Sequence, residues 1–91
     1  GHYGIQIMPK TSDLPGILIE LTVDRYCTQE KLNQLAETAL ERINDKKYES
    51  KMLAKDIRTI FKYGVAISGK DIVVSDIETS DRKKNTLEVP L

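Results

Sequence analysis

The sequence is poor in cysteine and proline, carries no excess of either charge and has no long apolar run. Its single cysteine, Cys27, excludes an internal disulfide and favours a reducing compartment. The 14 basic residues balance the 14 acidic ones, so the net charge gives no indication of a polyanionic partner. Because neither a charged and apolar leader nor a membrane-spanning stretch is present, we expect a cytoplasmic protein without a membrane partner.

The length and composition indicate one small globular domain. The chain has 91 residues, of which 40% are hydrophobic and 31% charged, and no internal repeat is visible. Gly1 and His2 have the character of an expression-tag remnant, and a chain that starts almost directly in a strand suggests a piece of a longer protein. We assign residues 1–76 to the domain and expect residues 77–91 to form a loose tail, unless its apolar residues dock on a partner.

Apolar periodicity predicts a mixed α/β sheet with helix cover. Thr28 is expected to cap the helix, and a Pro-Gly pair lies in the long loop of the first hairpin. Alternation in the strands and three- and four-residue spacing in the helix define the elements. They are strands at 3–8 and 16–24, a helix at 29–44, a connector with a helical turn at 46–55, and strands at 57–67 and 71–75.

The segment G-I-L-I-E-L-T-V-D at 16–24 places Glu20 inside an apolar run. On an extended backbone, one face carries Ile17, Ile19, Leu21 and Val23, while the other carries Leu18, Glu20, Thr22 and Asp24. We expect the helix to pack across the first, apolar face. Pairing with the preceding strand would gather a polar surface, the candidate site, from Gly4, Gln6, Glu20 and Thr22.

Four stretches carry a resemblance to a known family. They read G-H-Y-G-I at 1–5, L-I-E-L-T-V at 18–23, A-L-E-R-I-N-D-K-K-Y at 39–48 and Y-G-V-A-I-S-G-K at 63–70. In this order they resemble G-R-Y-D-I, I-I-E-F-K-V, A-L-x-Q-I-x-x-K-x-Y and Y-G-I-A-F-x-G-K. That pattern is typical of a branch of the PD-(D/E)xK nuclease superfamily, which forms the carboxy-terminal domain of bacterial AAA-ATPase-like proteins.

The resemblance implies a restriction-endonuclease-like fold, here truncated at the amino end, and a magnesium-dependent phosphodiesterase site. In the family, an aspartate at the position of Gly4 and a glutamate matching Glu20 hold Mg²⁺, and a lysine at the position of Thr22 assists the attacking water. Only Glu20 is retained as a metal ligand, so we expect at most weak magnesium binding. Arg42 also replaces the helix glutamine of the family, and His2 replaces its arginine.

These departures favour a catalytically degenerate domain of an ATPase-associated protein that contacts nucleic acid or protein. One alternative is an active nuclease whose missing groups come from Asp13 or Asp24, from Lys31 or Lys46, or from outside the chain. A second alternative is an interaction module that forms a homodimer through an exposed sheet edge.

A basic stretch between Glu41 and Lys62 is the candidate nucleic-acid contact, through Arg42, Lys46, Lys47 and Lys51. The alternative is a mixed, solvated surface, because acidic residues are interleaved with the basic ones. For Glu20 the alternative to a relic metal ligand is a carboxylate on the solvent face of an antiparallel strand. Cys27 has no histidine near it in sequence, so we interpret it as an inert thiol.

Overall fold

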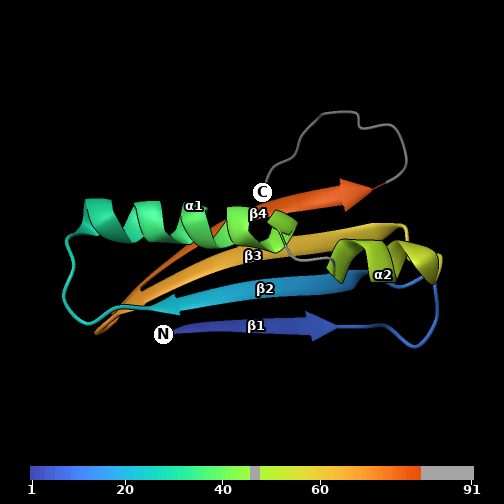
Figure 1. Ribbon diagram of the computed structural model, residues 1–91, viewed down its shortest axis with the longest axis horizontal. Coiled ribbons are helices and arrows are strands. Elements are labelled where there is room, and N and C mark those ends of the chain that lie inside the picture. Colours follow the sequence, from blue (N-terminus) through green and yellow to red (C-terminus); the bar gives the residue numbers. More distant parts are fainter. Residues whose placement is uncertain (46–47, 81–91) are drawn as a thin grey trace.

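A computed structural model describes residues 1–45 and 48–80 and shows a four-stranded mixed sheet with two helices on one of its faces (Figure 1). The strands lie in the order β1-β2-β3-β4, with β2 and β3 parallel and both outer pairs antiparallel. The α/β class and the mixed sheet are therefore as predicted. The elements are β1 (His2–Ile7), β2 (Gly16–Val23), α1 (Gln29–Asp45), α2 (Tyr48–Ala54), β3 (Thr59–Ser68) and β4 (Asp71–Ser80).

Each half of the sheet is a hairpin, β1–β2 on one side and β3–β4 on the other. The turn between β3 and β4 contains Gly69 with a φ of 60°, a left-handed conformation that glycine adopts without steric cost. β4 continues to Ser80, so the prediction that this strand ends at residue 75 was wrong. An edge strand forms by backbone pairing with its neighbour and does not need an apolar residue at every second position. Residues 81–91 of the predicted loose tail lie outside the described residues.

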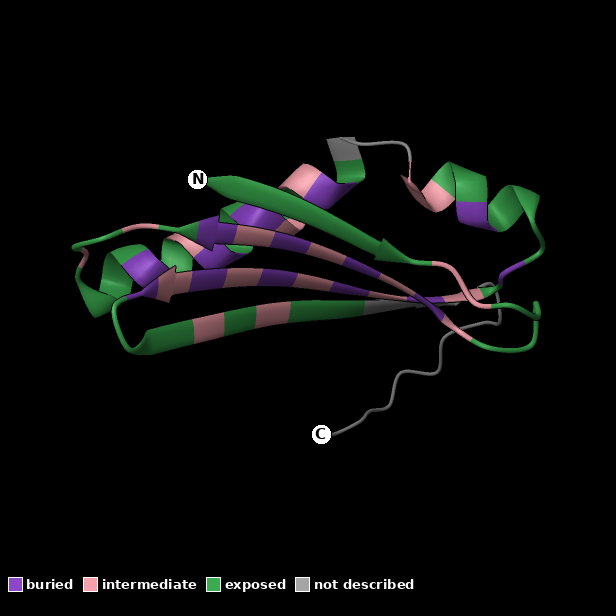
Figure 2. Ribbon diagram, turned by 90° about the horizontal axis from the view of Figure 1, so that it is seen from below, coloured by how far each residue is buried: buried purple, intermediate pink, exposed green. Residues whose placement is uncertain are grey.

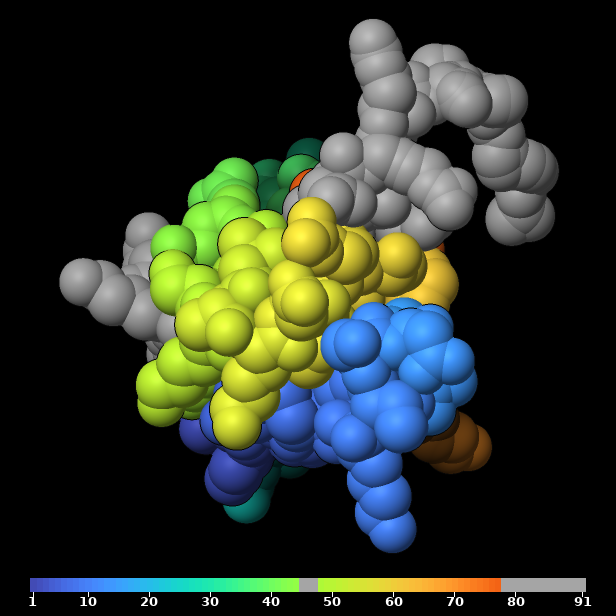
Figure 3. Space-filling model, turned by 90° about the vertical axis from the view of Figure 1, so that its right-hand side faces the viewer, coloured from blue at the N-terminus to red at the C-terminus, as the bar shows by residue number. Residues whose placement is uncertain are grey.

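The helices begin and end close to the predicted positions. Thr28 caps α1 as expected, because its Oγ1 accepts a hydrogen bond of 3.1 Å from the Lys31 amide. The predicted connector contains α2, a helix of seven residues whose Met52 is fully buried. Figure 3 shows α2, in yellow-green, against the light-blue β1–β2 loop. Gly16 allows this contact, because a Cβ at that position would overlap Met52 Sδ.

α1 packs against the face of the sheet that carries Leu18, Glu20 and Thr22, so the prediction that it covers the Ile17 face was wrong. The closest approach is at Gly64, where an added Cβ would collide with the Ala36 carbonyl oxygen and the Leu40 amide nitrogen. The absence of a side chain at this position lets the helix backbone lie directly on β3. Gly64 therefore permits the close approach of α1 on this side, where Leu18, Ile60 and Ala66 are fully buried.

Two clusters of buried residues fill the space between the helices and the sheet. Along β2 and β3, buried residues that face the helices therefore alternate with half-buried residues that face the other side (Figure 2). Neither helix in the described part of the chain is long and apolar enough to cross a membrane. The first cluster contains Leu18, Ile43, Met52, Ile57 and Ile60, and the second contains Leu32, Ala36 and Ala66.

The opposite side of the sheet, which we call the open face, has no helix or strand over it among the described residues (Figure 2). It is exposed to different degrees, from half-buried residues in the central strands to Ile72, which is 61% exposed. Its apolar residues are Tyr3, Ile5 and Ile7 of β1, Ile17, Ile19, Leu21 and Val23 of β2, Phe61, Tyr63, Val65 and Ile67 of β3, and Ile72 and Val74 of β4.

Candidate functional site

The β1–β2 hairpin brings the predicted site positions together. Gly4 lies directly opposite Glu20, and His2 lies directly opposite Thr22. Because side chains alternate along a strand, all four positions are on the same face of the sheet, together with Gln6 opposite Leu18. The prediction that these residues share one surface is confirmed.

The β2 part of that surface is enclosed by the protein, whereas His2, Gly4 and Gln6 of β1 are exposed. Glu20 is 1% exposed and Thr22 is 4% exposed, because α1 lies over the face to which both belong. The alternative interpretation of Glu20 as a carboxylate on a solvent face was therefore wrong. A carboxylate removed from water needs a compensating cation or hydrogen-bond donors, so the environment of Glu20 decides what it can do.

Arg42 supplies that cation from the last turn of α1. One guanidinium nitrogen lies 3.9 Å from Glu20 Oε2, within ion-pair range, and 3.5 Å from Thr22 Oγ1. His2 Nδ1 lies 3.2 Å from the same threonine oxygen, from across the hairpin. The Arg42 side chain is 28% exposed, so the cluster extends from the interior to the surface. Arg42 thus contacts both Glu20 and Thr22, and His2 contacts Thr22.

This donor set does not fit a divalent metal ion. Within residues 1–45 and 48–80, no group of three or more histidine, cysteine, aspartate or glutamate side chains is placed to hold one. Mg²⁺ prefers six oxygen ligands in octahedral geometry, and Glu20 contributes the one carboxylate from the strand positions of the site. The Arg42 guanidinium, next to that carboxylate, would also repel a second cation. In this arrangement Arg42 supplies the positive charge next to Glu20.

A second polar cluster, which the sequence analysis did not identify as a unit, lies between β3 and α2. Lys62 is 6% exposed, and its Nζ donates to Glu49 Oε1 at 2.7 Å and to Asn44 Oδ1 at 3.2 Å. The sequence contains a signal for this burial, because Lys62 alternates in phase with Ile60, Gly64 and Ala66. Lys62 therefore belongs to the helix-covered face rather than to a solvated basic surface.

The predicted nucleic-acid contacts do not form one described patch. Arg42 turns towards Glu20 and Thr22, whereas Lys51 is exposed on α2. Lys46 and Lys47 lie outside the described residues. Contact of these residues with nucleic acid therefore stays a prediction.

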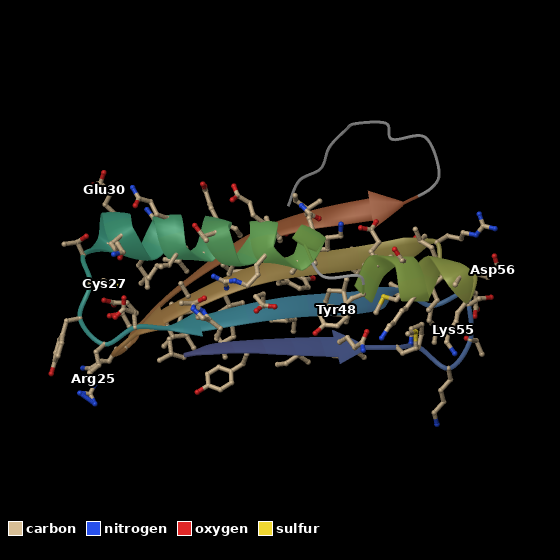
Figure 4. The ribbon with its side chains drawn as sticks, viewed as in Figure 1. Arg25, Cys27, Glu30, Tyr48, Lys55 and Asp56 are labelled. Carbon is tan, nitrogen blue, oxygen red and sulfur yellow. The ribbon has the colours of Figure 1, made fainter. Side chains whose placement is uncertain are left out.

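The remaining candidates lie apart from the site or have structural contacts. Figure 4 shows Arg25 and Cys27 at one end of the molecule, Lys55 and Asp56 at the other, and Tyr48 reaching over β2 from the start of α2. Cys27 is half-buried and packs against the cluster of Leu32, as a hydrophobic thiol does. Asp13 and Lys31 are exposed.

Comparisons of the chain with protein-family models, with curated proteins and with solved structures gave no match. The candidate site is thus defined by its own geometry. It consists of a buried glutamate and threonine on β2, an arginine from α1 that contacts both, a histidine opposite the threonine, and a glycine opposite the glutamate.

Proposed function

We propose that this chain is a catalytically inactive domain of the restriction-endonuclease-like kind that contacts nucleic acid or protein. One observation carries the proposal: Gly4, Glu20 and Thr22 lie together on adjacent strands, with Arg42 of α1 beside Glu20 and Thr22. The resemblance expects an aspartate, a glutamate, a lysine and a glutamine at these four positions. Association with an ATPase-like domain and a cytoplasmic location belong to the same proposal.

The chemistry of the cluster supports inactivity. Phosphodiester hydrolysis of the implied kind needs a divalent ion to acidify a water and a cation to stabilise the attacked phosphate. Thr22 carries no charge, and its hydroxyl oxygen already lies near both His2 and Arg42. Glu20 is buried and paired with Arg42. In this proposal the guanidinium holds the charge balance that a metal ion holds in an active relative.

A nuclease assay tests the inactivity directly. Single- and double-stranded DNA would be incubated with the protein and Mg²⁺ or Mn²⁺, beside the near-isosteric variant Glu20→Gln. We expect no metal-dependent cleavage that separates the two proteins. Cleavage by the parent chain that disappears in Glu20→Gln would establish an active enzyme and reject the proposal.

Restoring the missing groups tests the assignment of the positions. The triple variant Gly4→Asp, Thr22→Lys and Arg42→Gln places a second carboxylate opposite Glu20 and removes the competing guanidinium. Residues directly opposite on antiparallel strands have Cβ atoms about 4.5–5.5 Å apart, which lets two carboxylates share one ion. We expect calorimetry to detect Mg²⁺ binding in this variant and none in the parent chain.

A matched variant gives the control for this restoration. Gln6→Asp, combined with Thr22→Lys and Arg42→Gln, adds the same carboxylate on the same face but opposite Leu18 instead of Glu20. It is expected to bind Mg²⁺ more weakly than the variant with Gly4→Asp. Equal binding by the two variants, or none by either, would reject the correspondence between these positions and a metal site.

A further inference from the structure

The open face is a continuous apolar surface. Its exposed members run from one edge strand to the other, with Tyr3 57% exposed on β1, Val23 41% exposed on β2, and Val74 53% exposed on β4. The half-buried residues between them on β2 and β3 connect these edges. Exposed apolar patches of this extent on a protein surface mark sites of association.

The composition of the open face agrees with the centre of a protein interface. Charged residues are depleted from such centres, and aromatic residues are enriched in them. Among the described residues, the charged ones in register with this face are Asp76, opposite Tyr63, and Glu78, opposite Phe61, and both belong to the edge strand β4. Tyr3, Phe61 and Tyr63 supply three of the five aromatic residues of the chain. A surface without charge at its centre can meet a copy of itself without electrostatic repulsion.

The dimensions of the face match another sheet better than a single helix. Four strands spaced by about 4.8 Å span roughly 19 Å, and strands of this length extend over about 25 Å. The footprint is then on the order of 500 Å², so two copies in contact would bury about 1,000 Å², near the lower bound for a specific interface. A helix is about 10–12 Å wide and would cover roughly half of the strands.

We propose that the open face is the interface of a homodimer, in which the sheets of two copies of this chain pack face to face. The twofold axis passes near Ile19 and Val65 on the central strands, and the two sheets are separated by about 10 Å. The Asp76 side chains then lie at the rim of the interface. This inference does not depend on the proposed function, because the site of Glu20 and Arg42 is on the other side of the sheet.

Sedimentation velocity over a range of protein concentrations tests the dimer. We expect the parent chain to reach twice its mass of 10.3 kDa as the concentration rises. Val65→Lys places an unpaired ammonium at the centre of the interface, and we expect dimer affinity to fall about 100-fold. Leu53→Lys is the matched control, because Leu53 is 46% exposed on α2 and away from the open face. Its dimer affinity is expected to equal that of the parent chain.

Three outcomes would overturn the proposal. They are a parent chain that stays monomeric at every concentration, a folded Val65→Lys protein that dimerises as the parent does, and equal losses in Val65→Lys and Leu53→Lys. The second outcome would instead indicate a dimer that forms through a surface without Val65, such as an edge strand of the sheet. Circular dichroism of each variant shows whether it retains its fold.

A crosslinking experiment keeps the proposal testable if Val65→Lys does not fold. In a Cys27→Ser background, Val65→Cys places one thiol near the proposed twofold axis, whereas Leu53→Cys places it on α2. Sheets about 10 Å apart hold the two Cα atoms beyond the ~7 Å that a disulfide tolerates, so a short bismaleimide is used to join the thiols. We expect a crosslinked dimer from Val65→Cys in at least tenfold greater yield than from Leu53→Cys. Similar yields from the two variants would reject face-to-face packing.

Discussion

The two faces of the sheet are made by alternate residues of the same strands, yet the more polar face is the one that is covered. The covered face includes Glu20, Thr22 and Lys62, all buried, and the open face is almost entirely aliphatic and aromatic. Each buried polar group has a partner within reach, such as Arg42 for Glu20 and Glu49 for Lys62. In this protein the covered side is the one on which α1 approaches β3 closely at Gly64 and on which the buried charges are paired.

The largest expected effect comes from adding a side chain at the position where α1 packs most closely on β3. Gly64→Ala would place a methyl group against the Ala36 carbonyl oxygen and the Leu40 amide nitrogen, which are backbone atoms that cannot move aside separately. We expect the free energy of unfolding to fall by about 3 kcal/mol or more, as measured by urea denaturation.

Gly69→Ala provides the control for this substitution. A Cβ at Gly69 meets no atom within 4 Å, so its cost comes from the positive φ alone and should be about 1 kcal/mol. A smaller loss for Gly64→Ala than for Gly69→Ala would contradict the close packing of α1 on β3.

Substitution of two neighbouring residues of β2 tests the two faces separately, because Leu18 belongs to the covered face and Ile19 to the open face. Leu18 is fully buried in the first cluster, so Leu18→Ala should lower the free energy of unfolding by about 3 kcal/mol. Ile19 is half-buried, and Ile19→Ala should cost about 1 kcal/mol when measured at concentrations where the chain is monomeric. Equal losses would show that both faces are buried to the same extent.

The buried ion pair of Lys62 and Glu49 gives a further test of the covered face. Glu49→Ala leaves the ammonium of buried Lys62 with its hydrogen bond to Asn44 Oδ1, and should cost about 2 kcal/mol of stability. Replacing both groups, as Glu49→Leu with Lys62→Met, should recover most of that loss. A double-mutant cycle gives the coupling energy.

The exposed pair of Asp56 and Arg58 provides the reference cycle. Its side chains are 73% and 58% exposed at a distance of 3.0 Å, and the coupling is expected below about 0.5 kcal/mol. Asp56→Asn is the suitable change, because asparagine tolerates the φ of 66° at this position. Coupling as strong as that of the buried pair would remove the distinction between the two environments.

The elements and the hairpin of the site were predictable from local sequence. The alternation around Glu20 and the turn residues before Gly16 predicted both strands and the side-by-side position of Gly4 and Glu20. The cap at Thr28 and the spacing of apolar residues predicted α1. These features depend on neighbours in the chain, so the sequence contains their cause directly.

The side on which α1 packs was not predictable from alternation, because the face of β2 with Glu20 and Thr22 is the more polar one and was taken as the solvent side. Gly64 was interpreted as an interruption of a strand, whereas it is the point where α1 meets β3. The pairing of Arg42 with Glu20 and of Lys62 with Glu49 depends on the helix position in the same way. Because the face that α1 covers was predicted wrongly, the polar residues on that face were interpreted as exposed.

The parallel pairing of β2 with β3 has a consequence for how the chain folds. Each hairpin can close locally, but all of α1 and α2 lies between the two central strands in sequence. Bringing these strands together requires closure of a long segment before any stabilising contact is gained, and such non-local pairing is slow. We therefore expect the pairing of β2 with β3 beneath the first helix to limit the rate of refolding.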